Sequence, residues 1–313
     1  MIMNTAYLTH PACLKHDMGT GHPECPARIH AIEDQLIASG LWDFLRHHEA
    51  PKASKDELAR VHAIEYIEWV FNQSPHSGFM HLDGDTAMNP YSLNAALHAA
   101  GAGIKAIDLV MSNQVKNAFC NVRPPGHHAG RASASGFCIF NNVAITAAHA
   151  LEHHGLQRVA IADFDVHHGN GTEDIFHDDP RVMLCSTFRH PYYPYCGADS
   201  GNDHIINVPL AAGSSGAQFR TAVTEQWLPA LERFQPQFLF ISAGFDAHWE
   251  DDMGGLALRE ADYFWVTEIL KDIAGRHANE RIVSMLEGGY ALHALGRSVL
   301  AHIKSLLVLG IIT

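Results

Sequence analysis

Residues 158–170 read Arg-Val-Ala-Ile-Ala-Asp-Phe-Asp-Val-His-His-Gly-Asn, an apolar run that turns abruptly into a string of polar residues. Such an unbroken apolar run is typical of a strand that is buried on both faces, as strands of parallel sheets are. Four further runs have the same character, at residues 118–122, 182–187, 238–242 and 281–286. Each is followed by Gly, Pro, Asp or His residues, so the sequence predicts parallel strands with polar residues at their carboxyl ends.

Between these runs, apolar residues recur at helical spacing. A long helix is predicted over residues 91–111, and further helices over 143–154, 217–234, 260–274 and 291–307. The alternation predicts an α/β fold, with a single domain over residues 1–313 and a central, mostly parallel sheet flanked by helices on both faces. Residues 189–203 form the one long irregular region, and a loop of that length is usually functional.

The composition of the 313 residues argues against two classes of partner. No apolar run approaches the roughly 18 residues that a membrane span needs, and residues 1–5 lack the pattern of a signal peptide, so a cytoplasmic location is expected. The six cysteines have no CxxC spacing and are expected to be reduced thiols. The net charge is −13 without any Lys/Arg cluster, so no nucleic acid partner is expected. An acidic surface would favour a cationic substrate, or simply keep the protein soluble.

Polar residues from several segments are expected at one edge of the sheet, because ligands of parallel α/β sheets bind at the carboxyl ends of strands. The residues that follow the predicted strands are His127, His128, Asp163, Asp165, His167, Asp246 and Tyr290. Their convergence is stronger evidence for a site than any one motif.

Asp165 and His167 are two residues apart, so on an extended strand end both side chains point the same way. With Asp246 they offer two carboxylates and one imidazole, which leaves an open position for water, as a catalytic zinc site needs. Taken alone, this Asp-x-His pattern could equally be a helix cap beside a buried polar residue. A two-metal hydrolase would need carboxylates where Gly169 and His248 stand, so one catalytic metal ion is predicted.

The adjacent histidines His127 and His128 lie in the loop Arg-Pro-Pro-Gly-His-His-Ala-Gly at residues 123–130. Amide hydrolysis needs a base to activate water and an acid to protonate the leaving amine. Asp163 could orient one ring and raise its basicity, and Asn170 could orient the other. Tyr290 follows two glycines and could donate a hydrogen bond to a developing oxyanion.

Two other histidine pairs, at residues 47–48 and 153–154, lie in polar or helical stretches, and no chemical role is expected of them.

These motifs resemble those of the zinc-dependent histone deacetylase family, whose members have the arginase–deacetylase fold. The matching segments span nearly the whole chain: GHPECPAR at 21–28, RPPGHH at 123–128, GFCIFNN at 136–142, DFDVHHGNGT at 163–172, SAGFDAH at 242–248 and EGGY at 287–290. The chain is most similar to bacterial class II-type members, the histone deacetylase-like amidohydrolases. Asn170, where class I members have Asp, belongs to the class II pattern.

The resemblance implies a role for each motif residue. Zinc would be bound by Asp165, His167 and Asp246. His128 would act as general base and acid beside His127, and Tyr290 would polarise the acyl carbonyl. The tunnel for the acylated side chain would be formed by Phe137, Tyr193, Met253 and the Gly136 carbonyl, with Arg28 near the acetate exit.

The family also holds structural potassium. The first matching site would use Asp163, Asp165, His167 and Ser186, partly through backbone oxygens. A second would use backbone oxygens around Phe176, Asp179 and Val182.

The predicted function is removal of acetyl or short acyl groups from acylated amines, N-acetyl-lysine side chains in peptides or proteins above all. The alternative substrate is an acetylated polyamine. Met253 stands where polyamine-selective members can carry an acidic gatekeeper, which weakens that alternative, although Glu250, Asp251 and Asp252 could still attract a cation.

Two rival functions are disfavoured. A catalytically silent acyl-lysine-binding domain should have lost a metal ligand, a histidine of the tandem or the tyrosine, and a manganese ureohydrolase would not carry Gly169 and His248. A homo-oligomer is considered, with contacts through residues 15–17 and 189–203.

Overall fold

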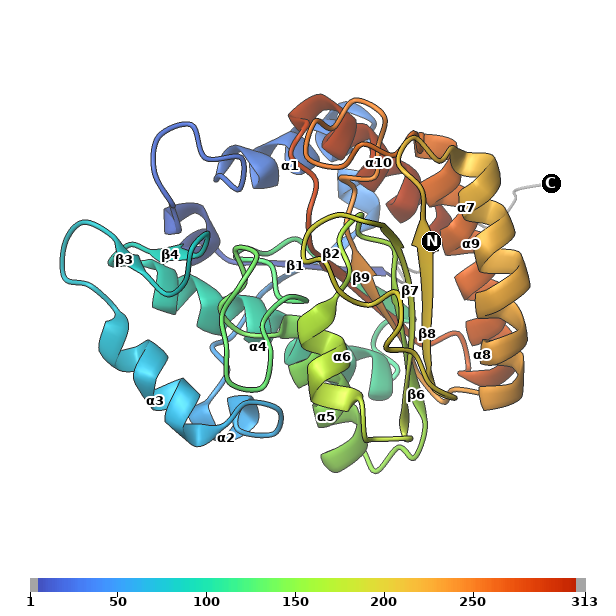
Figure 1. Cartoon of the computed structure of the whole chain (residues 1–313), viewed down its shortest axis with the longest axis horizontal. Helices are drawn as coiled ribbons and strands as arrows, with labels where there is room; N and C mark the ends of the chain where they lie inside the picture. The colour runs from blue at the N-terminus through green and yellow to red at the C-terminus, as the bar shows by residue number, and fades with distance from the viewer. Residues whose placement is uncertain (1–4, 308–313) are drawn as a thin grey trace.

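The central sheet contains eight strands, and every neighbouring pair runs parallel (Figure 1). The computed structural model describes residues 5–307. In spatial order the strands are β2 (Arg46–Glu49), β1 (Thr5–Thr9), β5 (Asn117–Cys120), β10 (Ile282–Leu286), β9 (Leu239–Ala243), β6 (Val159–Asp163), β7 (Val182–Arg189) and β8 (Ile205–Leu210). Two short strands, β3 (Met80–His81) and β4 (Ala87–Met88), form a separate antiparallel pair. The predicted α/β class with a central parallel sheet is therefore confirmed.

The five predicted strands are β5, β6, β7, β9 and β10, and they occupy contiguous positions in the sheet. All their residues are buried except Arg189 at the end of β7. The three strands that the sequence did not reveal flank them. The outermost two lack a continuous apolar run: β2 reads Arg-His-His-Glu with alternating exposure, and β8 contains Pro209, which suits an edge strand.

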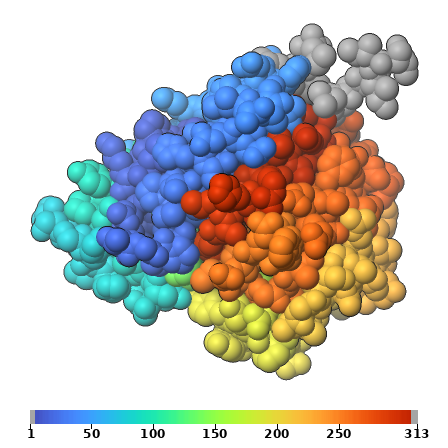
Figure 2. Space-filling view, turned by 90° about the horizontal axis from the view of Figure 1, so that it is seen from above, coloured from blue at the N-terminus to red at the C-terminus, as the bar shows by residue number. Residues whose placement is uncertain are grey.

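Helices cover both faces of the sheet (Figure 1). One layer contains α2 (Lys55–Leu58), α3 (Ile64–Gln73), α4 (Ser92–Met111), α5 (Asn142–Glu152) and α6 (Asn170–Phe176). The other contains α1 (Ala27–Ala38), α7 (Gly216–Ala222), α8 (Leu228–Phe234), α9 (Glu260–His277) and α10 (Leu292–Leu306). Short 3₁₀ helices span Pro11–Lys15 and Trp42–Phe44. Figure 2 shows the N-terminal segment, in blue, lying against the C-terminal helices, in red and orange.

The predicted helix over residues 217–234 is interrupted. A π-helical turn, Val223–Trp227, separates α7 from α8. Pro229 lies in the first turn of α8 and has no N–H to donate to a carbonyl one turn earlier. The wider turn before the proline lets the chain continue in the same direction, so one expected helix becomes three segments.

Alternate residues of each central strand enter different cores. On β6, Val159 and Ile161 join the core beneath α4 and α5, whereas Ala160 and Ala162 join the core beneath α9 and α10. This is the two-residue alternation of a strand between two helical layers. The alternation ends at Asp163, where the chain leaves the sheet and its polar residues begin.

Within the described residues, no helix is both long and apolar enough to cross a membrane. These residues form one domain. The proposed domain limits of 1–313 include termini that lie outside the described part, and the cytoplasmic location stays a prediction.

Candidate active site

Three predicted ligands meet at the carboxyl ends of β6 and β9. His167 Nδ1 lies 3.1 Å from Asp165 Oδ1 and 3.3 Å from Asp246 Oδ2. All three residues are buried. Two carboxylates and one imidazole, close enough to share one cation, are thus removed from bulk water.

Backbone amides hold the two carboxylates in place. Asp165 accepts hydrogen bonds from the N–H groups of His167 (2.9 Å) and Gly288 (2.8 Å), and Asp246 Oδ1 accepts one from Val166 (2.9 Å). A Cβ at Gly288 would overlap the Asp246 carboxylate, so this approach requires glycine. The carboxylates are oriented by N–H groups from two segments of the chain, residues 166–167 and Gly288.

The negative charges and the unpaired carboxylate oxygen of this cluster suit a metal cation. Among the described residues, Asp246 Oδ2 has no hydrogen-bond partner although it is buried. Burial and the charge of Asp165 raise the pKa of Asp246 to about 6. Burial alone would raise the pKa of Asp165 too, but His127 and His167 bring it below its usual range. A divalent cation at these atoms would remove the repulsion between the carboxylates and give Asp246 Oδ2 a partner.

His127 and His128 lie side by side in surroundings that act on them in opposite ways. Their ring centroids are 4.0 Å apart. His127 Nδ1 lies 2.9 Å from Asp163 Oδ2, and although burial opposes it, the Asp163 carboxylate raises the pKa of His127 to about 10. Burial, followed by the charges of His127 and His167, lowers the pKa of His128 well below its usual value. His127 is thus held as a cation and His128 is kept neutral.

The tautomer of His128 follows from its partner. Its Nδ1 lies 2.7 Å from Asn170 Oδ1. An amide oxygen only accepts, so Nδ1 carries the proton and Nε2 presents its lone pair. This arrangement suits a proton acceptor.

Tyr290 is held by a residue that the sequence did not single out for this purpose. The Asp251 carboxylate accepts hydrogen bonds from the backbone N–H groups of Tyr290 (2.6 Å) and Ala291 (2.9 Å). Burial raises the pKa of the Tyr290 phenol, partly opposed by Arg28, whose guanidinium carbon lies 5.0 Å from the ring centroid. Tyr290 therefore keeps its proton and can donate it in a hydrogen bond.

Asp251, one of the three acids that could attract a cation, is not free to do so at the surface. Its side chain is buried, and both its oxygens accept backbone N–H groups, with Met253 as the third donor (3.0 Å). Glu250 is paired with Arg297 at 2.7 Å. Of the three acids that could attract a cation, Asp252 is exposed and makes none of these contacts.

A cavity of ≈190 Å³ opens onto this cluster. Its walls are formed by Asp85, His128, Gly136, Phe137, His167, Tyr192, Tyr193, Met253 and Tyr290. Phe137 and Tyr290 stand at right angles with centroids 6.0 Å apart, and Tyr193 meets the edge of His128 at 5.2 Å. The structure thus brings all four predicted tunnel residues to one cavity, and adds Asp85 and Tyr192.

Behind the cavity, charged side chains are buried in pairs. Glu24 contacts both Arg28 and Arg123, and Arg28 donates to the Gly289 carbonyl at 2.7 Å. Glu287 accepts the N–H groups of Gly126 (2.7 Å) and His127 (3.1 Å), which fixes the loop that carries the two histidines. Glu24, Arg123 and Glu287 belong to quoted motifs, but the sequence offered no signal of the Glu24–Arg123 and Glu287–loop contacts, which join residues 99 or more positions apart.

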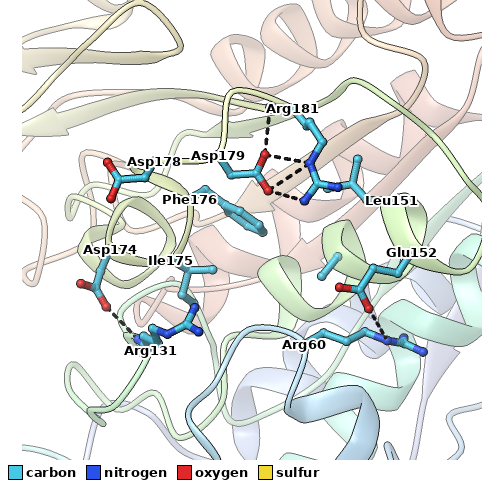
Figure 3. A pocket seen from close by; sticks show the side chains of 11 residues that line it. Arg60, Arg131, Leu151, Glu152, Asp174, Ile175, Phe176, Asp178, Asp179 and Arg181 are labelled. Carbon is cyan, nitrogen blue, oxygen red and sulfur yellow. Dashed lines mark hydrogen bonds and ion pairs between the residues drawn. The ribbon is translucent and has the colours of Figure 1, made fainter.

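A second hollow, beside α5 and α6, is separate from this site (Figure 3). It has a volume of ≈410 Å³, and several of its charges are paired, including Arg60 with Glu152 and Arg181 with Asp179. None of the predicted zinc ligands or proton-transfer residues lines it, whereas Phe176 and Asp179 of the second predicted potassium site do.

Comparison with known proteins agrees with this geometry. Residues 22–306 match the model of the histone deacetylase domain. The chain is 35% identical to a histone deacetylase-like amidohydrolase of Pseudomonas aeruginosa, over 93% of this chain and 83% of that protein. It is also 35% identical to human polyamine deacetylase HDAC10, over 97% of this chain and 48% of that protein. The crystal structure of the HDA15 HD domain superimposes with a TM-score of 0.91 at 36% identity, covering 97% of this chain and 88% of that one.

Proposed function

The chain belongs to the histone deacetylase family, and we propose that it is a zinc-dependent amidohydrolase that removes acetyl or another short acyl group from N-acylated lysine side chains. The observation that carries this proposal is the unpartnered oxygen of Asp246, buried beside a neutral histidine and a protonated tyrosine at one cavity. These are the parts that amide hydrolysis needs: a cation site, a base and an oxyanion donor.

Asp165, His167 and Asp246 would hold the zinc ion. Bound zinc lowers the pKa of water to about 7 and polarises a carbonyl. Of these three residues, His167 lines the same cavity as His128 and Tyr290.

His128 carries out the proton transfers, and Tyr290 stabilises the negative charge that develops on the carbonyl oxygen. His128 Nε2 takes a proton from the attacking water, while Asn170 keeps the ring oriented through Nδ1. The phenol of Tyr290 donates a hydrogen bond to the carbonyl oxygen as it gains negative charge. When the tetrahedral intermediate collapses, His128 returns the proton to the leaving amine, and the adjacent positive charge of His127 makes that transfer easier.

The cavity favours a linear alkyl chain that carries the acyl amide. Phe137 and Tyr193 provide aromatic walls, and the Gly136 carbonyl is available to accept the amide N–H. A Cβ at Gly136 would overlap the ring of His128, so the backbone comes close to the reacting centre.

An acetylated polyamine is the second candidate substrate, because a relative is named a polyamine deacetylase. Two observations argue against a polyamine substrate. Met253, which lines the cavity, is uncharged, and the Asp251 carboxylate accepts hydrogen bonds from backbone N–H groups. Asp85 is the acidic group at the cavity that could still attract a polyamine cation.

The experiment compares kcat/KM of the zinc-loaded protein on an acetyl-lysine peptide and on acetylputrescine, with a chelator-treated sample as control. The proposal expects at least a tenfold advantage for the peptide, which is about 1.4 kcal/mol in the barrier. The reverse ratio would make it a polyamine deacetylase. Activity that survives removal of the metal would overturn the zinc mechanism.

Potassium is proposed as a structural ion at the first site expected from the family. Ser186 Oγ is buried there and lacks a hydrogen-bond partner among the described residues. At the second site, the carbonyls of Phe176 and Asp179 each accept one backbone N–H and keep a free lone pair. The homo-oligomer stays a prediction.

A further inference from the structure

Three histidines and one aspartate gather where α5 ends, at the opposite end of β6 from the catalytic cluster. Asp108 belongs to α4, His149 to α5, and His153 and His154 follow directly after α5. One nitrogen or oxygen atom from each of the four residues can be chosen so that all lie within 4.8 Å of one another.

Two of the imidazoles converge on one carboxylate oxygen. His149 Nε2 lies 3.0 Å from Asp108 Oδ1, and His154 Nε2 lies 2.8 Å from the same atom. With metal–ligand bonds of about 2.0–2.1 Å, adjacent ligand atoms of a tetrahedral zinc site are about 3.3 Å apart. The present spacing is already close to that value, and it is similar to the 3.1 and 3.3 Å found in the catalytic cluster.

The third imidazole, that of His153, can turn toward the other three side chains. His149 and His153 are four residues apart, and their rings stack with centroids 4.6 Å apart. A histidine pair at this helical spacing is a common basis for a zinc site. His153 is exposed, and its ring makes no hydrogen bond to any residue of the described segment. Rotation about its side-chain bonds therefore breaks no hydrogen bond and gives up only its ring contacts with His149 and His154.

One positive group faces the cluster and has to be accounted for. Arg60 Nη1 lies 2.5 Å from Nδ1 of His149, on the far side of the ring from Asp108. A cation on Nε2 would leave the proton on Nδ1, so Arg60 would lose this acceptor. Arg60 is also paired with Glu152 at 3.3 Å, a contact that Figure 3 shows, and this carboxylate can keep its charge compensated.

We propose that Asp108, His149, His153 and His154 form a second, non-catalytic site for a divalent transition-metal ion of the zinc class. Three imidazoles and one carboxylate suit zinc, nickel, cobalt or copper, whereas calcium and magnesium prefer sets made of oxygen atoms. An ion here joins α4 to the end of α5, so it stabilises the packing of these two helices. The side chains are partly exposed, so the ion exchanges with solvent more readily than one in the buried catalytic cluster.

The test counts bound metal on the full-length, zinc-loaded protein after dialysis against free Zn²⁺, and separately against Ni²⁺. The wild-type protein should bind a second equivalent. The double variant His153→Ala/His154→Ala should bind one and keep the same turnover. Asp108→Asn should weaken the second equivalent at least tenfold, because it removes the charge with little change of shape.

A matched control removes two exposed histidines elsewhere, His76→Ala/His177→Ala, and should still bind two equivalents. A second readout is the thermal unfolding midpoint, which excess metal should raise in the wild type and control but not in the His153/His154 variant. The proposal is overturned if the wild type binds a single equivalent, or if the cluster variant and control behave alike. The count does not depend on the catalytic activity, so the two proposals fail separately.

Discussion

The clusters at the two ends of β6 use similar donor atoms at similar spacings, but the chain surrounds them very differently. In the catalytic cluster every ligand is buried, and backbone N–H groups orient both carboxylates. In the cluster around Asp108, the aspartate side chain is 42% exposed and His153 is exposed as well. This comparison indicates that the spacing of donor atoms can predict a cation site. Amide hydrolysis also requires a dry cavity, a base and an oxyanion donor beside that site.

The largest effects are expected from variants that remove the oxyanion donor or the base beside the catalytic cluster. Tyr290→Phe should lower kcat by about 10²–10³, because an oxyanion donor is lost. His128→Ala should lower it by about 10²–10⁴, because the proton acceptor is lost. Circular dichroism and the unfolding midpoint should stay close to wild type. The control His154→Ala should keep wild-type turnover, and a comparable loss in that variant would break the contrast.

Asp251 should affect catalysis by positioning Tyr290, although its carboxylate also binds the N–H groups of Ala291 and Met253. Asp251→Asn keeps one acceptor oxygen but loses the charge that holds two backbone N–H groups, so we expect kcat to fall about tenfold with little change in KM. The loss should be smaller in Asp251→Asn than in Asp251→Ala, which leaves three N–H groups without this partner, at about 1–3 kcal/mol for each that is buried. If KM rises as much as kcat falls, Asp251 acts on substrate binding instead.

In metal-free protein, Asp246 and Glu287 should contribute stability that is lost as the pH rises from about 4 to 7. Burial raises the folded-state pKa of Asp246 to about 6 and that of Glu287 to about 7. At these two groups the folded state binds more protons than the unfolded state, so raising the pH favours unfolding, whereas burial lowers the pKa of His128, which opposes this loss below pH 6.5. The raised pKa values of His127 and His167 act in the same direction as those of Asp246 and Glu287 above pH 6.5.

The measurement is the urea midpoint as a function of pH, with and without zinc. Bound zinc and the variant Asp246→Asn should each flatten the curve. Asp108 should not contribute to the decline: burial would raise its pKa, but hydrogen bonds from His149 and His154 lower it overall, so its stabilisation is present above about pH 4. A decline that persists unchanged in Asp246→Asn would argue against the proposed strain between the buried carboxylates.

The smallest expected effect concerns the rim of the cavity. Met253→Glu places a carboxylate at a wall that is now uncharged, and it should raise kcat/KM for acetylputrescine relative to the acetyl-lysine peptide by about tenfold. Met253→Gln is the matched uncharged control and should leave the ratio close to wild type. Equal ratios in the two variants would mean that charge at this position does not select the substrate.

The sequence predicted the parts of the molecule whose signals are local. The central strands were readable because they are buried on both faces, and Asp165 and His167 because their spacing on a strand end places them together. Strand β2 could not be predicted from the sequence, because this edge strand carries polar residues and lacks an apolar run.

Contacts between distant segments account for most of what the sequence left out. The sequence suggests Asp251 only as an acid that could attract a cation, yet its side chain binds the backbone of a residue 39 positions later. The pair at 153–154 looked incidental because its partner Asp108 lies on another helix, 46 residues before His154. Only the packing of α4 against α5 brings these groups together.

The most direct test of the account is a titration of metal-free protein with zinc, following turnover of an acetyl-lysine peptide and bound metal together. Activity should rise in proportion to the first equivalent and reach its plateau there, while the second equivalent adds nothing to the rate. In Asp246→Ala the first equivalent and the activity should both be lost. Activity without metal, or activity that appears only with the second equivalent, would contradict the assignment of the chemistry to Asp165, His167 and Asp246.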